Sequence, residues 1–473
     1  MSAAQVPVAA RSRFGLLCAF VVVLALALRL LYAFAAKPEN PIRGDINDYV
    51  IYAWNLTQTG TFSSELSTGD PVTPDAYRGP GYPAVLALAM KAAGDVVVSV
   101  REGDGGRLML VAEPPRWIGY AYVVQAVLGA LTVLLTMLLA RAWMSEGAAL
   151  AAGLLVALWP HLIVFAGTLL GETLFGFALV FALWLLAAGW RTQRSGINAI
   201  AGLAFGAAYL VNPIIGLFPV FATAALWRRG NVRIAAIFFV AFAIAPVAWG
   251  LRNASLETKT PGAAQRIGQN FVQGSWPQFL TALNSRLVND ISAQIVAAES
   301  EEEKTFLADP AAGLAAMRER MAMDPGYYVG WYLLRKPYLL WDWNVRVGWG
   351  DIYFLVTPNS PFERIPMLKA MRLAFAAINP IVFAFAALAG LAAGFAFLRP
   401  RSAVAFPLAM TAWMALYLTA VHVVLQGEPR YAIAYRPEEV LLAVTGAAWI
   451  VARLRDRSRS RKPAAATSAM LAP

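Results

Sequence analysis

Ten apolar stretches, several of them separated only by short connections that carry arginine, constrain this chain more than any other feature. They lie at 14–36, 117–140, 148–170, 173–190, 197–211, 213–227, 234–251, 373–398, 404–425 and 440–452. A helix of about 20 apolar residues spans the hydrocarbon core of a bilayer. The pattern therefore predicts an all-α, polytopic integral membrane protein with about ten transmembrane helices.

The composition agrees with a membrane protein and argues against a nucleic-acid-binding one. Hydrophobic residues make up 59% of the chain and charged residues 14%, whereas soluble domains have roughly 45–50% and about 25%. The net charge of +11 comes from Lys and Arg at the ends of the apolar stretches. We attribute it to membrane topology and expect no nucleic acid partner. The single cysteine, Cys18, excludes a disulfide within one chain.

The distribution of arginine predicts the topology. A cytoplasmic N-terminus places the arginine-bearing connections at 141–147, 191–196, 228–233 and 399–402 inside, as the positive-inside rule requires. Nearly all other polar segments then lie outside. We expect an integral inner-membrane protein whose active site faces the periplasm.

Four regions follow from this topology. They are an N-terminal transmembrane module at 1–251 with an outer loop at 37–116, an extracytoplasmic helical segment at 252–372, C-terminal transmembrane helices at 373–453, and a basic, disordered cytoplasmic tail at 454–473.

The first apolar stretch is too long for a cleaved signal peptide. Its 23 residues exceed the usual apolar region of about 7–15 residues, so we expect a retained membrane anchor. Arg29 lies toward its outer end, and we interpret it as a side chain that snorkels to the interface.

The outer loop contains a predicted amphipathic helix that begins at Asp45 and stops at Gly60. Its apolar face has the spacing i, i+3, i+4 and i+7, and we expect it to lie along the bilayer surface. Asp45 either caps this helix or has a functional role. The face consists of Tyr49, Tyr52, Ala53 and Leu56.

Charged side chains gather at the outer ends of the apolar stretches and form the candidate site. A carboxylate at a membrane boundary is costly unless it is hydrated or paired, and the planar fork of arginine suits a phosphate. We predict catalytic roles for Asp45 and Glu172. The predicted substrate-binding residues are Asp48, Tyr49, Tyr77, Arg78, Tyr82, Arg252, Arg430 and Tyr431.

The remaining polar features have simpler interpretations. Glu299, Glu301, Glu302 and Glu303 indicate a solvated helix face. The outer tryptophans favour an interfacial aromatic belt over a sugar site, and they are Trp331, Trp341, Trp343 and Trp349. His161 and His422 lack the spacing of metal ligands, so we expect polar core residues, and a divalent metal stays an open possibility.

Several motifs resemble the GT-C membrane glycosyltransferases, in particular bacterial relatives of the protein O-mannosyltransferases and the lipid A aminoarabinose transferases. They sample most of the length of the chain. The motifs are Asp45-x3-Tyr49-x3-Ala53-x-Asn55-Leu56, Gly60-x-Phe62-Ser63, Tyr77-Arg78-Gly79-Pro80-Gly81-Tyr82-Pro83, Gly171-Glu172-Thr173-Leu174-Phe175, Trp249-Gly250-Leu251-Arg252-Asn253 and Glu428-Pro429-Arg430-Tyr431.

This resemblance implies a polyprenyl-phosphate sugar as donor and an acceptor hydroxyl on a glycan, glycolipid or protein. It implies that Asp45 matches the catalytic carboxylate of the loop, Glu172 the second acidic position and Arg78 the basic residue before the turn. Because the acceptor hydroxyl has to lose a proton, we expect Asp45 to serve as the base. The chain departs from the aminoarabinose enzymes, which have Asp-Glu where it has Asp45-Ile46 and Lys-Pro-Pro where it has Arg78-Gly79-Pro80.

Two other functions remain open on the sequence alone. A lipid-linked sugar flippase or transporter would place its ionisable residues near the bilayer midplane, whereas here they gather on one face. A non-catalytic membrane subunit of an envelope-assembly complex is the second alternative.

Overall fold

The computed structural model describes residues 8–38, 41–67, 71–94, 99–102, 108–111, 116–256, 262–344, 357–399 and 401–460. The N-terminal half contains α1 (Val8–Ala35), α2 (Asp45–Gln58), α3 (Gly81–Ala93), α4 (Arg116–Ala140), α5 (Glu146–Leu158), α6 (Pro160–Val164), α7 (Glu172–Thr192), α8 (Ser195–Val211), α9 (Phe218–Arg228) and α10 (Val232–Ala254). Short 3-10 turns, η1 (Phe165–Gly167) and η2 (Pro213–Ile215), follow α6 and α8.

The second half begins with the outer helices α11 (Ala263–Gly274), α12 (Phe279–Ser285), α13 (Asp290–Ala308), α14 (Pro310–Ala322), α15 (Pro325–Gly330), the π-helical turn η3 (Trp331–Arg335) and α16 (Lys336–Trp341). It ends with α17 (Pro361–Arg364), α18 (Pro366–Leu398), α19 (Phe406–Val424), the 3-10 turn η4 (Tyr431–Tyr435) and α20 (Arg436–Ser460).

A helix occupies each of the ten predicted transmembrane positions, and the chain is an integral membrane protein. Within the described residues, six helices are long and apolar enough to cross a membrane, or seven if the bent pair α5 and α6 forms one span. The expected count of ten is therefore not reached by length and composition. The helices α8 and α9 fall short in length, and α20 has Glu438 and Glu439 in its first turn and several arginines toward its end.

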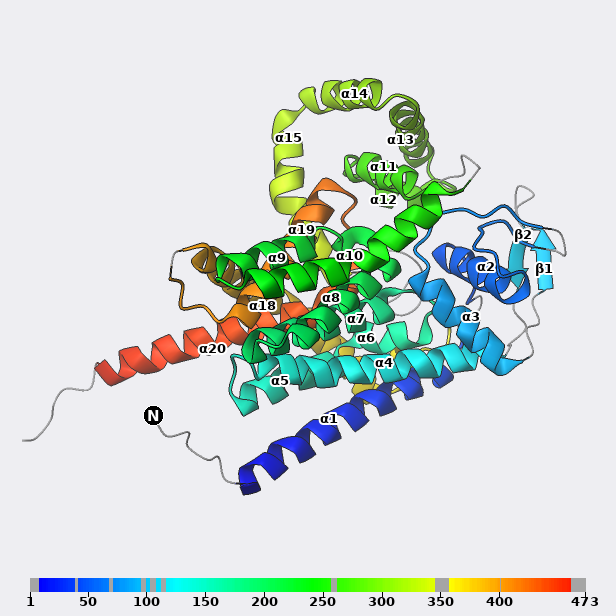
Figure 1. The fold of residues 1–473 in the computed structure, drawn as a ribbon. Coiled ribbons are helices and arrows are strands. Elements are labelled where there is room, and N and C mark those ends of the chain that lie inside the picture. Colours follow the sequence, from blue (N-terminus) through cyan, green and yellow to red (C-terminus); the bar gives the residue numbers. More distant parts are fainter. Residues whose placement is uncertain are drawn as a thin grey trace, which may run out of the picture.

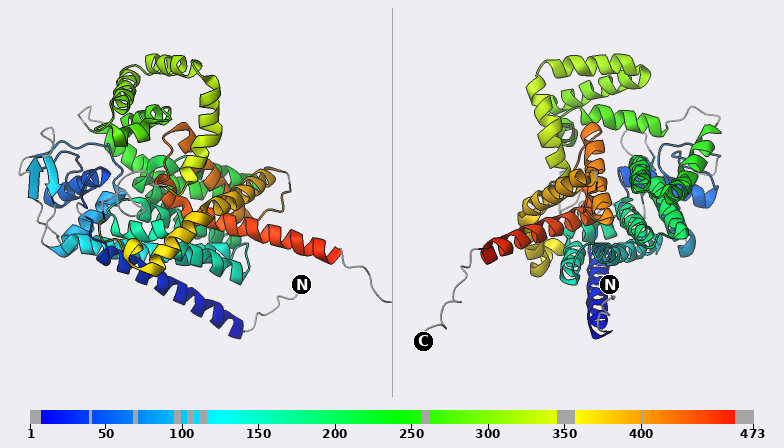
Figure 2. Two further views of the ribbon diagram at one scale, coloured as in Figure 1. Left: turned by 180° about the vertical axis from the view of Figure 1, so that it is seen from behind. Right: turned by 60° about the vertical axis from the view of Figure 1, so that its left-hand side comes forward.

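The two ends of the bundle are distinct. Figures 1 and 2 show α2 and α3 at one end, and the start of α1 and the finish of α20 at the opposite end. The described part of the chain therefore begins and ends at the same end of the bundle. α20 continues to Ser460, so the part of the expected disordered tail at 454–460 is helical; 461–473 lie outside the described residues.

Arg29 does not snorkel, because it is buried inside the bundle with 1% of its surface exposed. α5 and α6 meet at an angle of 58°, and Pro160 has no N–H to donate to the carbonyl of Val156. Arg29 donates instead, from Nη2 to Val156 at 3.3 Å and from Nη1 to Ala157 at 3.2 Å. The arginine thus satisfies backbone groups that the bend leaves open.

The helix α2 packs against the rest of the protein along one face, and its position along the bilayer surface stays a prediction. Its residues Ile46, Val50 and Ala53 are fully buried, and α2 packs against α3. Gly44 occupies the N-cap position, and no side chain caps the helix. Asp45 is the first helical residue, so its interpretation as a helix cap is wrong.

The all-α class is confirmed except for one small hairpin. The antiparallel strands β1 (Ser99–Glu102) and β2 (Leu108–Val111) pair within the region expected to be a polar loop. Figure 1 shows the hairpin beside α2.

The outer helices α11 to α15 form an arch above the bundle (Figure 1). In the acidic run of this arch Glu301 is exposed, whereas Glu299, Glu302 and Glu303 are turned inward, so the expected solvated face is wrong for these three. Glu302 pairs with Arg320 at 2.7 Å, Gln269 donates to Glu303 at 2.9 Å, and Glu299 is 2% exposed. Because the arch has to close on itself, these side chains serve as its core.

Buried tryptophans attach the outer helices to the rest of the protein. The Nε1 of Trp331 donates to the carbonyl of Gly274 at 3.1 Å, and that of Trp341 donates to Thr419 Oγ1 at 3.0 Å. Both rings are less than a tenth exposed, so the aromatic belt is the wrong interpretation for them. Trp349 lies outside the described residues.

Glu299 makes stability depend on pH. Burial and the charges of Glu303 and Glu302 raise the pKa of Glu299 to about 8 from its usual 4.5. The folded protein then holds a proton that the unfolded chain releases, so stability falls as pH rises from about 4.5 to about 8. We expect Glu299→Gln to weaken this dependence, measured as thermal unfolding in detergent at pH 5 and pH 8.

Glu301→Gln is the matched control, because Glu301 lies on the same helix with 72% of its side chain exposed. It should keep the wild-type difference between the two pH values. If Glu299→Gln shows the same difference in thermal unfolding between pH 5 and pH 8 as the wild type, Glu299 is not the source of the pH dependence.

Candidate active site

Five charged side chains from distant parts of the chain form one alternating ion-pair network. Arg78 Nη2 lies 2.8 Å from Asp45 Oδ1, and Arg78 Nε lies 3.1 Å from Asp48 Oδ2. Arg430 Nη2 lies 2.7 Å from Asp45 Oδ2, and Arg430 Nε lies 2.8 Å from Glu172 Oε1. The order Asp48, Arg78, Asp45, Arg430, Glu172 therefore joins the first outer loop to α7 and to the turn before η4.

Asp45 is the centre of this network because each of its two oxygens binds a different guanidinium. Asp45 and Asp48 lie three residues apart in the first turn of α2, where the helix dipole favours negative charge. Burial by itself raises the pKa of Asp45, but the charges of Arg430 and Arg78 outweigh it and hold that pKa well below its usual value. Asp45 is therefore ionised at neutral pH.

Aromatic rings enclose Arg78, whose side chain is 4% exposed. Its guanidinium carbon lies 5.2 Å from the centre of the Tyr49 ring and 5.4 Å from that of Tyr77. Tyr49 in turn packs edge-on against Tyr82 at 5.2 Å. The hydroxyl of Tyr82 donates to Gln125 Oε1 at 3.2 Å, which fixes this wall to α4.

The glycines that flank Pro80 permit the turn to rest directly on the end of α8. A Cβ on Gly79 would lie 2.6 Å from the carbonyl oxygen of Leu210, and one on Gly81 would lie 2.7 Å from Val211 Cγ2. Real Cβ atoms do not approach so closely, so only glycine fits. The backbone of Arg78 is thereby held against the bundle.

Arg252 and Tyr431 support the site from outside the ion-pair network. Arg252 Nη1 donates to the carbonyl of Asp75, and its guanidinium lies 4.9 Å from the centre of the Trp249 ring. Asp75 accepts further hydrogen bonds from Tyr52 and from Ser64. Arg252 therefore fixes the loop that leads to Tyr77 instead of facing the carboxylates.

Tyr431 donates from its hydroxyl to Gln426 Oε1 at 3.1 Å, and its ring stacks on His422 with the centres 5.1 Å apart. His422 Nδ1 lies 2.9 Å from the carbonyl oxygen of Gln426, and its Nε2 lies 3.2 Å from the Tyr435 hydroxyl. The expected polar core role of His422 agrees with these contacts. They stiffen the turn that carries Arg430.

The sequence did not indicate the role of α11. Arg266 on this helix lies 5.9 Å from the centre of the Tyr77 ring, and its charge helps to lower the pKa of Asp45. Tyr77 donates to Gln269 Oε1 at 3.2 Å, which docks α11 on the turn. Arg266 brings the group to three cations against three carboxylates. Its only sequence signal is a lone arginine in a polar stretch.

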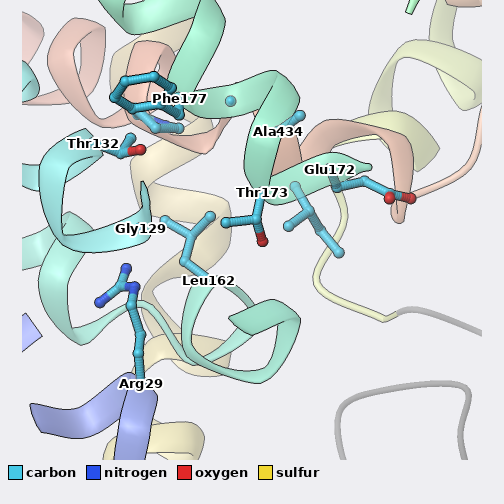
Figure 3. Close-up of a pocket in the computed structure, with 11 residues that line it drawn as sticks. Arg29, Gly129, Thr132, Leu162, Glu172, Thr173, Phe177 and Ala434 are labelled. Carbon is cyan, nitrogen blue, oxygen red and sulfur yellow. The ribbon is translucent and has the colours of Figure 1, made fainter. Parts of the chain in front are cut away.

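A small cavity of about 20 Å³ lies behind Glu172, on the bundle side (Figure 3). Figure 3 shows Arg29 and the Glu172 carboxylate at opposite ends of it, with that carboxylate turned away from the arginine. Thr173 lies between them in this view, and Thr132 also lines the cavity. Its size allows a single water molecule, so the cavity separates Arg29 from the network.

No group of three or more His, Cys, Asp or Glu side chains suited to a metal occurs within the part of the chain that the structure describes. His161 is buried, and its ring lies 4.3 Å from that of Trp343, in agreement with the core role expected for it.

We expect Gly79→Ala to shift the backbone that carries Arg78, because its new methyl group would press on Leu210. The free energy of unfolding should fall by about 1–3 kcal/mol, as for other overpacked sites. Gly250→Ala is the control, because nothing lies within 4 Å of a Cβ there. Thermal unfolding in detergent tests both, and equal stability of the two variants would contradict the close contact.

No protein-family model matches the chain, and no curated protein matches it in sequence. The structure is similar to AglB, an archaeal oligosaccharyltransferase from Archaeoglobus fulgidus, in complex with an inhibitory peptide and a dolichol-phosphate. The identity is 15%, the match covers 97% of this chain and 53% of that chain, and the TM-score is 0.47. This chain thus spans about half the length of the archaeal enzyme.

The structure is also similar to ArnT from Cupriavidus metallidurans. For ArnT bound to undecaprenyl phosphate the identity is 16%, the coverage is 94% of this chain and 80% of that chain, and the TM-score is 0.40. For the apo state the values are 17%, 88%, 78% and 0.36. At these values the similarity is remote, so the roles of the site residues are inferred from the geometry of this site alone.

Proposed function

We propose that this protein is an inverting glycosyltransferase that moves a sugar from a polyprenyl-phosphate donor to an acceptor hydroxyl at the periplasmic face of the inner membrane. The observation that carries the proposal is the position of Asp45 between Arg78 and Arg430. Two enclosed guanidinium groups, held side by side by carboxylates, form a site for one phosphate.

The leaving group explains why arginine is needed. A lipid phosphate departs as an anion, so its departure depends on cations already fixed in place more than on a proton donor. Arg78 binds the two aspartates through Nε and Nη2, and its Nη1 takes no part in these ion pairs. A phosphate can therefore join the network without dismantling it.

The site stands at the right depth for a lipid-linked substrate. Glu172 is the first residue of α7, one of the helices long enough to cross a membrane. The network therefore marks the boundary between the apolar bundle and the polar loops. A prenyl chain can remain in the membrane while its phosphate reaches Arg430, which pairs with Glu172.

The aromatic walls supply the remaining contacts. Tyr49 and Tyr77 flank the guanidinium of Arg78, Tyr82 supports Tyr49 from the bundle side, and Asp48 holds Arg78 in position. Tyr431 and Arg252 act through the segments that they fix. The acceptor is a glycan, a glycolipid or a protein whose hydroxyl oxygen attacks the anomeric carbon. Its proton goes to a carboxylate, and the carbon–oxygen bond to the phosphate breaks with its electron pair on the phosphate.

The test is transfer of radiolabelled sugar from a panel of polyprenyl-phosphate sugars to envelope extract by purified protein in lipid. We expect the rate of transfer to fall by about 100-fold or more in Asp45→Asn and in Glu172→Gln. Each substitution weakens an ion pair that holds a guanidinium group in position for the phosphate. Asp456→Asn is the control, since Asp456 is exposed on α20.

Transfer that survives both substitutions would contradict the site. If the wild type transfers sugar from none of the donors, the proposed glycosyltransferase activity is contradicted. Movement of lipid-linked sugar between the leaflets would then favour a flippase.

A further inference from the structure

Glu428 is a buried carboxyl group that the ion-pair network does not use. It lies in the turn between α19 and η4, two residues before Arg430, and is 5% exposed. Its Oε1 has no hydrogen-bond partner among the described residues. A buried carboxylate oxygen without a donor is costly, so its presence calls for a reason.

The charges around Glu428 belong to the candidate site. Arg430 acts on it from the same turn, Asp45 from α2 and Glu172 from α7. Tyr431 is the adjacent titratable group on the turn. From α16, Lys336 contacts the turn, since a Cβ on Gly427 would lie 3.0 Å from Lys336 Cγ. Glu428 is therefore next to the catalytic network without being bound by it.

The other side of Glu428 lines a cavity of about 40 Å³ between the outer helices and this turn. Trp276, Trp331 and the amides of Gln273 and Gln426 also line it, and Glu428 is the ionisable residue among its described lining residues. The volume suits a hydroxyl group or two water molecules and is too small for a sugar ring. A hydroxyl group therefore fits in the space beside the carboxyl group of Glu428.

The contact between the outer helices and the turn is close enough to define this cavity. A Cβ on Gly274, at the end of α11, would lie 2.3 Å from the carbonyl oxygen of Leu425 and 2.8 Å from the nitrogen of Gln426. Lys336 Nζ also donates to the carbonyl of Gly274 at 2.9 Å. The segment that closes the cavity is thus fixed against the turn that carries Glu428.

Glu428 and Asp45 differ in what they can do with a proton. Both oxygens of Asp45 accept from arginine, and its pKa is depressed, so it has little affinity for a proton at neutral pH. Burial raises the pKa of Glu428 to about 7, against the opposing charge of Arg430 and with help from Asp45 and Glu172. A base works best when its pKa lies near the working pH.

We propose that Glu428 is the catalytic base that takes the proton from the acceptor hydroxyl, while Asp45 is a positioning residue that holds Arg78 and Arg430. The inference rests on the proposed glycosyl transfer and names a residue for one of its steps. The acceptor O–H bond breaks and its proton goes to Glu428. The oxygen bonds to the anomeric carbon, and the phosphate leaves with the electron pair of its own bond to that carbon.

The experiment compares two nucleophiles on the same donor. A hydroxyl acceptor must lose a proton, whereas azide is an anion at neutral pH and needs no base. In Glu428→Gln we expect transfer to the hydroxyl to fall by at least about 100-fold, and formation of glycosyl azide to stay within about twofold of the wild type. Glu301→Gln, an exposed residue of the arch, should leave both reactions unchanged.

The pH profile gives a second reading. With the wild type, transfer to the hydroxyl should rise as pH increases through about 7, where Glu428 becomes a carboxylate. Azide transfer should lack this rise, and so should the residual activity of Glu428→Gln. Glu428→Asp keeps a carboxylate and should recover part of the hydroxyl reaction, and equal thermal unfolding of the three proteins confirms that they are folded.

The failures are distinguishable. Unchanged hydroxyl transfer in Glu428→Gln would overturn the role of Glu428 and leave the proposed function standing. Parallel loss of hydroxyl and azide transfer in a folded Glu428→Gln would also overturn it, because the residue would then serve the donor side. If the wild type transfers sugar to neither nucleophile from any donor, the proposed function itself falls.

Discussion

The two ion pairs that Asp45 makes with Arg78 and Arg430 are the interaction on which the candidate site depends. The two oxygens of Asp45 join Arg78 to Arg430, and so join the first outer loop to the last outer turn, 385 residues apart in the chain. Neither guanidinium is fully hydrated, since Arg78 is 4% and Arg430 14% exposed. Removing the carboxylate would leave two enclosed cations to repel each other. Asp45 therefore ties together two segments that lie far apart in the chain.

The packing around Asp45 serves mainly to keep its partners in place. Gly79 and Gly81 press the backbone beside Arg78 onto α8. Arg252 fixes the preceding loop through Asp75. The arch contributes α11, which docks on Tyr77 and brings a third cation. A site made of charges needs such rigidity, because preorganised groups stabilise a developing charge at no reorganisation cost.

From the sequence, the positions of helices and of candidate site residues were easier to predict than the contacts that their side chains make. Apolar length located the helices, and charge at the ends of apolar stretches located Asp45, Asp48, Arg78, Glu172 and Arg430, all of which lie in the network. Charge alone says nothing of where a side chain turns. Arg29 and Glu299 were expected at a surface and are buried, because a bend in another helix and a closed arch surround them. Such environments arise from contacts between distant segments, which one sequence does not display.

Electrostatic balance explains how the same site can be stable at rest and bind an anion. Asp45, Asp48 and Glu172 carry three negative charges, and Arg78, Arg430 and Arg266 carry three positive ones, so the group is close to neutral without a ligand. A donor phosphate adds one negative charge, and its departure as a free anion adds more. When the Glu428 carboxylate takes the proton of the acceptor hydroxyl, as proposed above, it becomes neutral, and this change offsets the negative charge that the phosphate gains. Proton transfer and phosphate departure would then stabilise each other through the arginines that lie between them.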